Sequence, residues 1–168
     1  MRHSGKTRTF LTAAALGLSV TAMAGSVANA QQTTLNIGMG SADAGKLDPH
    51  IATTTPDKGL LHWMFNGLVR IQPGEASPAF IEPDIASSWT TSPDGLTWVF
   101  TLRDDVECHG EYGNLDAEDV VFSLKRAANS EQSSFSGDFK AFQSIEATGP
   151  YEVTITLANS IPSLLGTL

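Results

Sequence analysis

The sequence predicts a mixed α/β fold of the α+β kind, and three observations carry this prediction. A strand–turn–strand pattern runs from Ala86 to Gly110. Two helical segments carry N-terminal capping residues, at Thr55 and at Asp116. A further segment, residues 151–157, alternates apolar and polar residues as a half-buried strand does. Residues 31–168 are numerous enough to form one domain with a core of its own.

The first thirty residues have the three parts of a secretory signal peptide. A basic head precedes an apolar run from Phe10 to Ala24, and small residues at Ala28 and Ala30 come directly before Gln31. The apolar run is short for a helix that spans a membrane, which is the alternative interpretation. We therefore expect cleavage after Ala30, export, and a mature protein that is not stably inserted in a membrane.

The charge of the mature chain excludes two classes of partner. Three of the ten Lys and Arg residues precede Gln31 and all 18 Asp and Glu residues follow it, so the mature chain has a formal charge of −11. Nucleic acids and anionic lipids bind basic surfaces, and neither is expected here. Cys108 is the only cysteine, so the chain forms no intramolecular disulfide.

The segment before the hairpin predicts a strand, a helix and a second strand. A strand is expected from Thr34 to Met39, because its apolar residues alternate. A helix follows, with Thr55 as N-cap and with Gly67 as the left-handed residue that ends it. Residues 68–71 form the second strand, which leads into a Pro-Gly turn.

The hairpin itself carries the strongest local signals. Residues 92–95, Ser-Pro-Asp-Gly, predict a type I turn, and the residues after it alternate large apolar side chains with smaller or polar ones. Trp89, Trp98 and Phe100 could form a stacking platform for a ligand, but alternating aromatic residues on a hairpin more often belong to a core. Residues 106–109 are expected to form a further short strand.

The last third predicts one helix and one strand. Asp116 and Asp119 have the spacing of a capping box, and apolar residues then recur on one helical face up to Ala128. A polar loop, residues 130–137, is interrupted by Phe135 and precedes the strand at 151–157. The final eight residues look like the opening of an apolar helix, so we expect the chain to be an N-terminal fragment.

Four stretches of the chain, in this order, resemble family 5 extracellular solute-binding proteins, the oligopeptide-, dipeptide- and nickel-binding group of ABC importers. The hairpin is the most specific of them. The sequence departs from the family pattern in the loop from Cys108 to Gly113. The four stretches are Leu47-Asp48-Pro49-His50 with Phe65-Asn66-Gly67-Leu68-Val69, Ala86 to Asp104, Leu115 to Leu124, and Tyr151 to Leu157 with Ile161-Pro162.

The resemblance implies a class II periplasmic-binding-protein-like fold, of which this chain is a part. Residues 31–65 would be the first segment of lobe one, and residues 66–168 an incomplete β-rich accessory subdomain. The resemblance further implies a monomer in the periplasm that captures a small peptide-type solute by hinge closure and delivers it to an inner-membrane ABC permease. No enzymatic activity and no cofactor are implied.

Four residues are candidates for contact with solute, carried over from the family. Thr53, Thr54 and Thr55 follow the Asp-Pro-His stretch whose loop lines the cleft in the family, and Phe135 holds the place of an aromatic residue that reaches into it. Each also has a purely structural interpretation, since Thr55 can cap a helix and Phe135 can anchor a loop.

Three alternatives to this interpretation come from other classes of protein. Glu107, Cys108, His109 and Glu111 offer ligands for zinc or nickel, which would make this a secreted metal-binding domain or a metalloenzyme that uses Cys108 and His109. In an extended strand, however, Cys108 points away from its two neighbours. Asp48, His50 and His62 could be drawn as an acid–base group, but no spacing places a nucleophile beside them. A stand-alone β-rich domain is the third possibility.

Overall fold

The structure, a computed structural model, describes residues 34–40 and 43–168. The chain divides into two compact units, Met1–Ile37 and Gly38–Leu168, which are described separately. The expected signal peptide and its cleavage site lie outside the described residues. The expected strand from Thr34 to Met39 is wrong, because these residues have no regular secondary structure and the side chain of Leu35 is 80% exposed. Alternation alone does not form a strand without a partner for its backbone groups.

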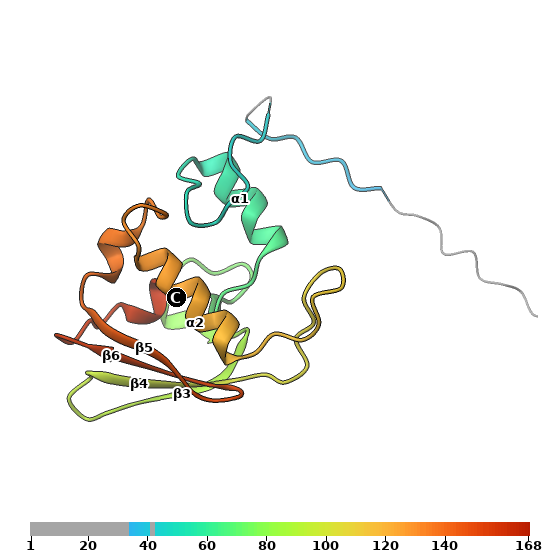
Figure 1. Ribbon diagram of the computed structural model, residues 1–168. Helices are drawn as coiled ribbons and strands as arrows, with labels where there is room; N and C mark the ends of the chain where they lie inside the picture. The colour runs from blue at the N-terminus through green and yellow to red at the C-terminus, as the bar shows by residue number, and fades with distance from the viewer. Residues whose placement is uncertain (1–33, 41–42) are drawn as a thin grey trace, which may run out of the picture. The chain divides into compact units, whose positions relative to one another are not determined.

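A four-stranded antiparallel sheet organises the second unit. Its strands are β3 (Ala86–Thr91), β4 (Thr97–Leu102), β6 (Glu152–Leu157) and β5 (Phe142–Gly149), in that spatial order (Figure 1). A separate two-stranded ribbon pairs β1 (Val69–Ile71) with β2 (Ile81–Pro83). The predicted hairpin and the last predicted strand are confirmed, whereas β5 was not predicted.

The hairpin has the expected turn and places its aromatic residues in the core. Gly95 has a φ of +71°, which favours glycine, and its N–H donates to the Ser92 carbonyl at 2.9 Å. Phe100 is fully buried and pairs with Trp89 on β3 and with Val153 on β6. The Trp89 and Phe100 ring centroids are 6.4 Å apart. These aromatic residues pack within the domain, as expected from the sequence.

The first helix, α1 (Thr55–Met64), begins and ends earlier than expected. The N-cap is Thr54, whose Oγ1 accepts from the Asp57 N–H at 3.3 Å, so Thr55 is the first helical residue rather than the cap. The helix ends at Met64 with Phe65 as its C-cap, and Gly67 is not left-handed. Gly67 is required for a different reason: a Cβ there would lie 2.9 Å from the Val69 carbonyl oxygen.

The second helix, α2 (Ala117–Ala128), has the predicted capping box and packs on β5 and β6 (Figure 1). Asp116 accepts from the Asp119 N–H at 3.1 Å, and Asp119 accepts from the Asp116 N–H at 3.1 Å. Its buried residues are Ala117, Val120, Val121 and Ala127. Ala128, where the predicted apolar face ended, is only half-buried, so the buried face is slightly rotated from the prediction.

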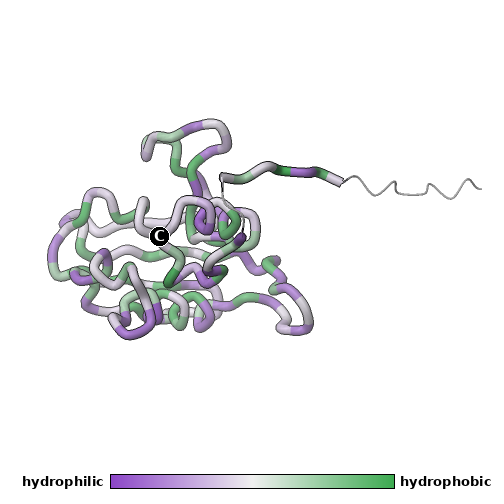
Figure 2. Tube along the Cα trace, turned by 90° about the horizontal axis from the view of Figure 1, so that it is seen from above, coloured by the Kyte–Doolittle hydropathy of each residue, from purple (hydrophilic) through white to green (hydrophobic). Residues whose placement is uncertain are grey.

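The remaining segments are short. The expected strand at 106–109 is a single bridge between Glu107 and Asn114. The described residues contain three 3₁₀ turns, Pro78–Phe80, Ser136–Phe139 and Leu164–Gly166. The last of them stands where the sequence suggested the opening of an apolar helix, and it buries Leu164 in the core. Figure 2 shows apolar and polar stretches interspersed along the coloured trace. Among the described residues no helix has the length and apolar character needed to cross a membrane.

Candidate functional site

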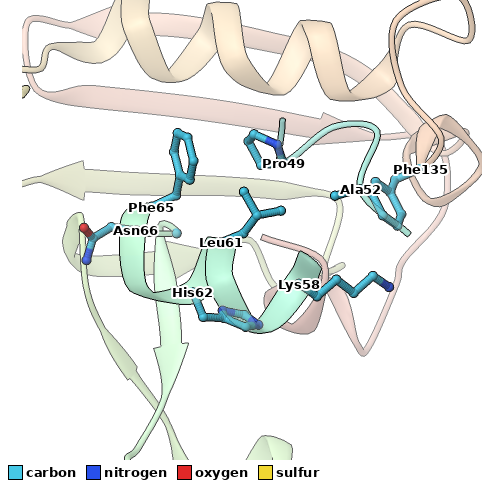
Figure 3. A pocket seen from close by; sticks show the side chains of 9 residues that line it. Pro49, Ala52, Lys58, Leu61, His62, Phe65, Asn66 and Phe135 are labelled. Atoms are coloured by element: carbon cyan, nitrogen blue, oxygen red, sulfur yellow. The ribbon is translucent and has the colours of Figure 1, made fainter. Parts of the chain in front are cut away.

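An open pocket of about 280 Å³ lies between α1, the loop before it and the loop after α2 (Figure 3). The helix contributes Lys58, Leu61 and His62, and the preceding loop contributes Pro49 and Ala52. The other lining residues are Phe65, Asn66, Gly67 and Phe135. Apolar walls with a few polar groups at the edge are typical of small-molecule sites.

Phe135, in the loop after α2, lines this pocket beside α1. Its ring centroid lies 5.1 Å from Lys58 Nζ, a cation–π distance, and its N–H donates to Ser133 Oγ at 3.0 Å. The structure thus brings Phe135 to the pocket that the loop after Asp48 also lines. Its contact with solute stays a prediction.

The three candidate threonines are exposed, and none of them lines the pocket. Thr54 has a defined structural role as the N-cap of α1. Their neighbour Ala52 is buried and does line the pocket. Their contact with solute also stays a prediction.

Asp57, in the first turn of α1, anchors the loop around Gly45 to this helix. Its side chain is 4% exposed, and its carboxylate accepts from the Gly45 N–H at 2.8 Å and the Lys46 N–H at 3.2 Å. The hydrogen bond from Gly45, followed by that with Thr54, lowers the pKa of Asp57. A Cβ at position 45 would lie 2.9 Å from Asp57 Oδ2, so the loop needs glycine there.

Arg126, in the last turn of α2, binds the Asp-Pro-His loop and was not predicted as a site residue. Its guanidinium group donates to both carboxylate oxygens of Asp48, with Nη1 at 3.0 Å from Oδ1, and also contacts His50 Nδ1. The hydrogen bonds from Arg126 lower the pKa of Asp48 to about 2. Burial, and then the charge of Arg126, lower the pKa of His50, which favours its neutral form.

The same cluster superficially resembles a hydrolase triad, because Ser123 Oγ lies 3.4 Å from His50 Nε2. In a triad the carboxylate accepts from the imidazole Nδ1–H and stabilises the imidazolium. Here Nδ1 faces Arg126, and Asp48 Oδ1 is 3.6 Å from it with both carboxylate oxygens bound to the guanidinium. The arrangement suits an ion pair and disfavours general-base catalysis. His62 lies apart from it, on α1 at the pocket.

Three of the four proposed metal ligands, all except Glu111, line a second, larger groove. Glu107, Cys108 and His109 border a cavity of about 650 Å³ together with exposed aromatic residues such as Phe122. Within residues 34–40 and 43–168, no three His, Cys, Asp or Glu side chains gather closely enough to hold a metal ion. The Cys108 thiol is free and half-buried.

Comparison of the sequence with known proteins gives consistent relatives. Residues 81–168 match the model described as bacterial extracellular solute-binding proteins, family 5 Middle. The chain is 30% identical over 132 residues to the probable D,D-dipeptide-binding periplasmic protein DdpA of Escherichia coli, covering 76% of this chain and 25% of that protein. It is 36% identical over 92 residues to the nickel-binding periplasmic protein of the same organism, covering 54% and 16%.

Solved structures show the same relationship. The binding protein MoaA from A. tumefaciens R10, in complex with mannopinic acid, is 49% identical, with a TM-score of 0.74 over 76% of this chain and 26% of that one. NikZ from Campylobacter jejuni, in complex with Ni(L-His), is 30% identical, with a TM-score of 0.65 over 75% and 24%.

The chain therefore spans about a quarter or less of the length of these relatives. The mixed α/β architecture, with neighbours among class II periplasmic binding proteins, confirms the expected fold class. Since the family model matches more than half of the residues, the chain belongs to the family 5 bacterial extracellular solute-binding proteins.

Proposed function

We propose that this chain is part of the solute receptor of an ABC importer, which works in the periplasm as a monomer. The family consists of solute-binding proteins rather than enzymes. In this proposal residues 31–65 open lobe one and residues 66–168 belong to the accessory subdomain. The receptor closes on its solute about a hinge, and the closed form delivers the solute to the inner-membrane permease.

The observation that carries this proposal is the pocket between α1 and Phe135. Segments far apart in the sequence meet there, and the pocket is open to solvent. An open pocket is what we expect of a half-site that a second lobe completes. Thr53, Thr54 and Thr55 are exposed and directly follow Ala52, which lines the pocket. In this proposal their hydroxyl groups bind the polar edge of the solute after closure.

The solute we propose is a small molecule that carries a carboxylate. Lys58 and His62 place cationic or hydrogen-bonding groups beside apolar walls in the pocket. MoaA, whose structure contains mannopinic acid, shares 49% of its aligned residues with this chain. Peptide-type solutes are the second candidate, favoured by the match to the dipeptide-binding protein of E. coli, 31% identical over 69% of this chain.

Calorimetry on the receptor expressed from its complete coding frame tests both candidates. Titrations use mannopinic acid and, separately, a set of dipeptides. We expect one class to bind with a dissociation constant in the micromolar range or tighter, that is, with about 8 kcal/mol or more. If neither class binds at 1 mM solute, on the order of 4 kcal/mol, and native mass spectrometry finds no co-purified solute, the proposal is wrong.

A further inference from the structure

The loop before α1 and the loop after α2 are connected through Arg126. Its guanidinium binds Asp48 in a two-pronged manner and contacts His50, across 78 and 76 positions of sequence. The planar guanidinium offers several donors in a fixed fork, so one side chain can fix two acceptors at a defined angle. A lysine at this position could not reproduce that geometry.

A second set of hydrogen bonds links the Asp-Pro-His loop to the loop that carries Phe135. The His50 carbonyl accepts from the Ser134 N–H at 2.8 Å, and the buried Ser133 accepts from the Phe135 N–H at 3.0 Å. The Asp48 carbonyl accepts from the Ala52 N–H at 3.0 Å. Hydrogen bonds at Asp48 and His50 therefore connect Arg126 both to the loop that carries Ala52 and to the loop that carries Phe135.

The hydrophobic core does not include these walls. The core cluster is formed by the sheet, by α2 and by the residues next to β1, and neither Pro49, Ala52 nor Phe135 belongs to it. The ion pair is also partly open to solvent, with Arg126 30% and Asp48 32% exposed. Ion pairs of this exposure add about 1 kcal/mol or less to global stability, so the loss of this pair should loosen the pocket more than the fold.

We infer that Arg126 is a positioning residue of the solute site: through Asp48 and His50 it holds the loop before α1 and the Phe135 loop in the arrangement that forms the pocket. This inference rests on the proposed function for its effect on solute. It assigns Arg126 no contact with solute. Its role is to keep the competent pocket populated before solute arrives.

The size of the effect follows from the populated fraction of the competent pocket. If removal of the guanidinium reduces that fraction to about one tenth, the apparent dissociation constant rises about tenfold. The variant is Arg126→Gln. The matched control is Lys125→Gln, which removes a positive charge from the same turn of α2 without touching the Asp-Pro-His loop.

Two readouts on the receptor from its complete coding frame decide the question. Hydrogen exchange of the solute-free protein is expected to become faster at the Ser134 and Ala52 amides in R126Q, but not in K125Q. Amides in β4 and β6 should lose at most about fivefold in protection, the effect of about 1 kcal/mol of global stability, and less than the Ser134 and Ala52 amides lose. Calorimetry with mannopinic acid and with dipeptides is expected to show a dissociation constant about ten times higher in R126Q, and an unchanged one in K125Q.

The outcomes separate this inference from the proposed function. Unchanged exchange at Ser134 and Ala52 in R126Q would overturn the positioning role. An unchanged dissociation constant in R126Q, with solute bound by the wild type, would also overturn it and leave the proposed function intact. A wild type that binds neither solute would overturn the proposed function. A Phe135→Ala variant that weakens solute binding while exchange in the loop before α1 stays slow would support both.

Discussion

Replacement of Asp48 by Asn is expected to lower the free energy of unfolding by about 1 kcal/mol at pH 7. The pKa of Asp48 in the folded protein is about 2, against 3.8 for the free side chain. A difference of this size corresponds to roughly 2.4 kcal/mol, at about 1.4 kcal/mol per pH unit. Since Asp48 is 32% exposed, solvent screens part of this interaction, and we expect about half of it to remain.

The pH dependence follows from the direction of the shift. The folded protein holds the proton of Asp48 less tightly than the unfolded chain does, so the stabilisation is complete above about pH 4 and declines as the pH falls through about 2. At pH 3 roughly half of it should be lost. The difference between wild type and Asp48→Asn should therefore shrink by about half between pH 7 and pH 3.

Urea unfolding of the full-length receptor at pH 7, 5, 4 and 3 measures this difference. The control is Asp105→Asn, because Asp105 binds Arg103 at 2.9 Å but both side chains are more exposed. We expect a smaller loss in the control. The reasoning would be refuted if Asp48→Asn cost the same at pH 3 as at pH 7, or no more than the control at pH 7.

Three further predictions concern the core, the pocket and the proposed metal ligand. Phe100→Ala, at a fully buried position, should cost about 3–5 kcal/mol in urea unfolding, whereas Phe122→Ala, at a position 71% exposed, should cost less than about 0.5 kcal/mol; equal costs would contradict the core assignment. Phe135→Ala should weaken solute binding about tenfold by calorimetry, the loss of one aromatic contact, with an unchanged urea midpoint; unchanged affinity would remove Phe135 from the site. After incubation with nickel and desalting, the wild type should retain no metal through Cys108, and stoichiometric nickel that is lost in Cys108→Ala would instead favour the metal-binding alternative.

Elements with a complete local signal were predicted from the sequence. The capping box of α2 needs only Asp116 and Asp119, and the hairpin turn needs only the four residues that end at Gly95. Both signals act over a few positions of chain, so no tertiary contact can override them easily. The N-cap of α1 was displaced by one residue, since Thr54 and Thr55 are equally suited and only the backbone geometry selects between them.

Strand β5 was missed because it does not alternate regularly. Its pairing with β6 shifts register between Phe142 and Ser144 and again between Ala147 and Gly149. Each irregularity adds a residue on one strand and moves the following side chains to the other face. As a result Phe142, Ile145 and Ala147, which face the core, are spaced by three and then two positions. A search for period-2 alternation cannot detect such a strand.

The site was harder to predict than the fold because its organising contact is not local. The sequence explains Arg126 fully as a cation that complements the C-terminal end of a helix dipole, and Asp48 fully as a turn residue next to a proline. Neither explanation leaves a signal that the two residues meet. Only the packing of α2 on the sheet brings the last turn of that helix to the loop before α1. Each residue that shapes this pocket therefore has a sufficient local explanation in the sequence, which gives no reason to place it at a site. Hydrogen bonds between residues far apart in the sequence, seen only in the structure, identify these residues.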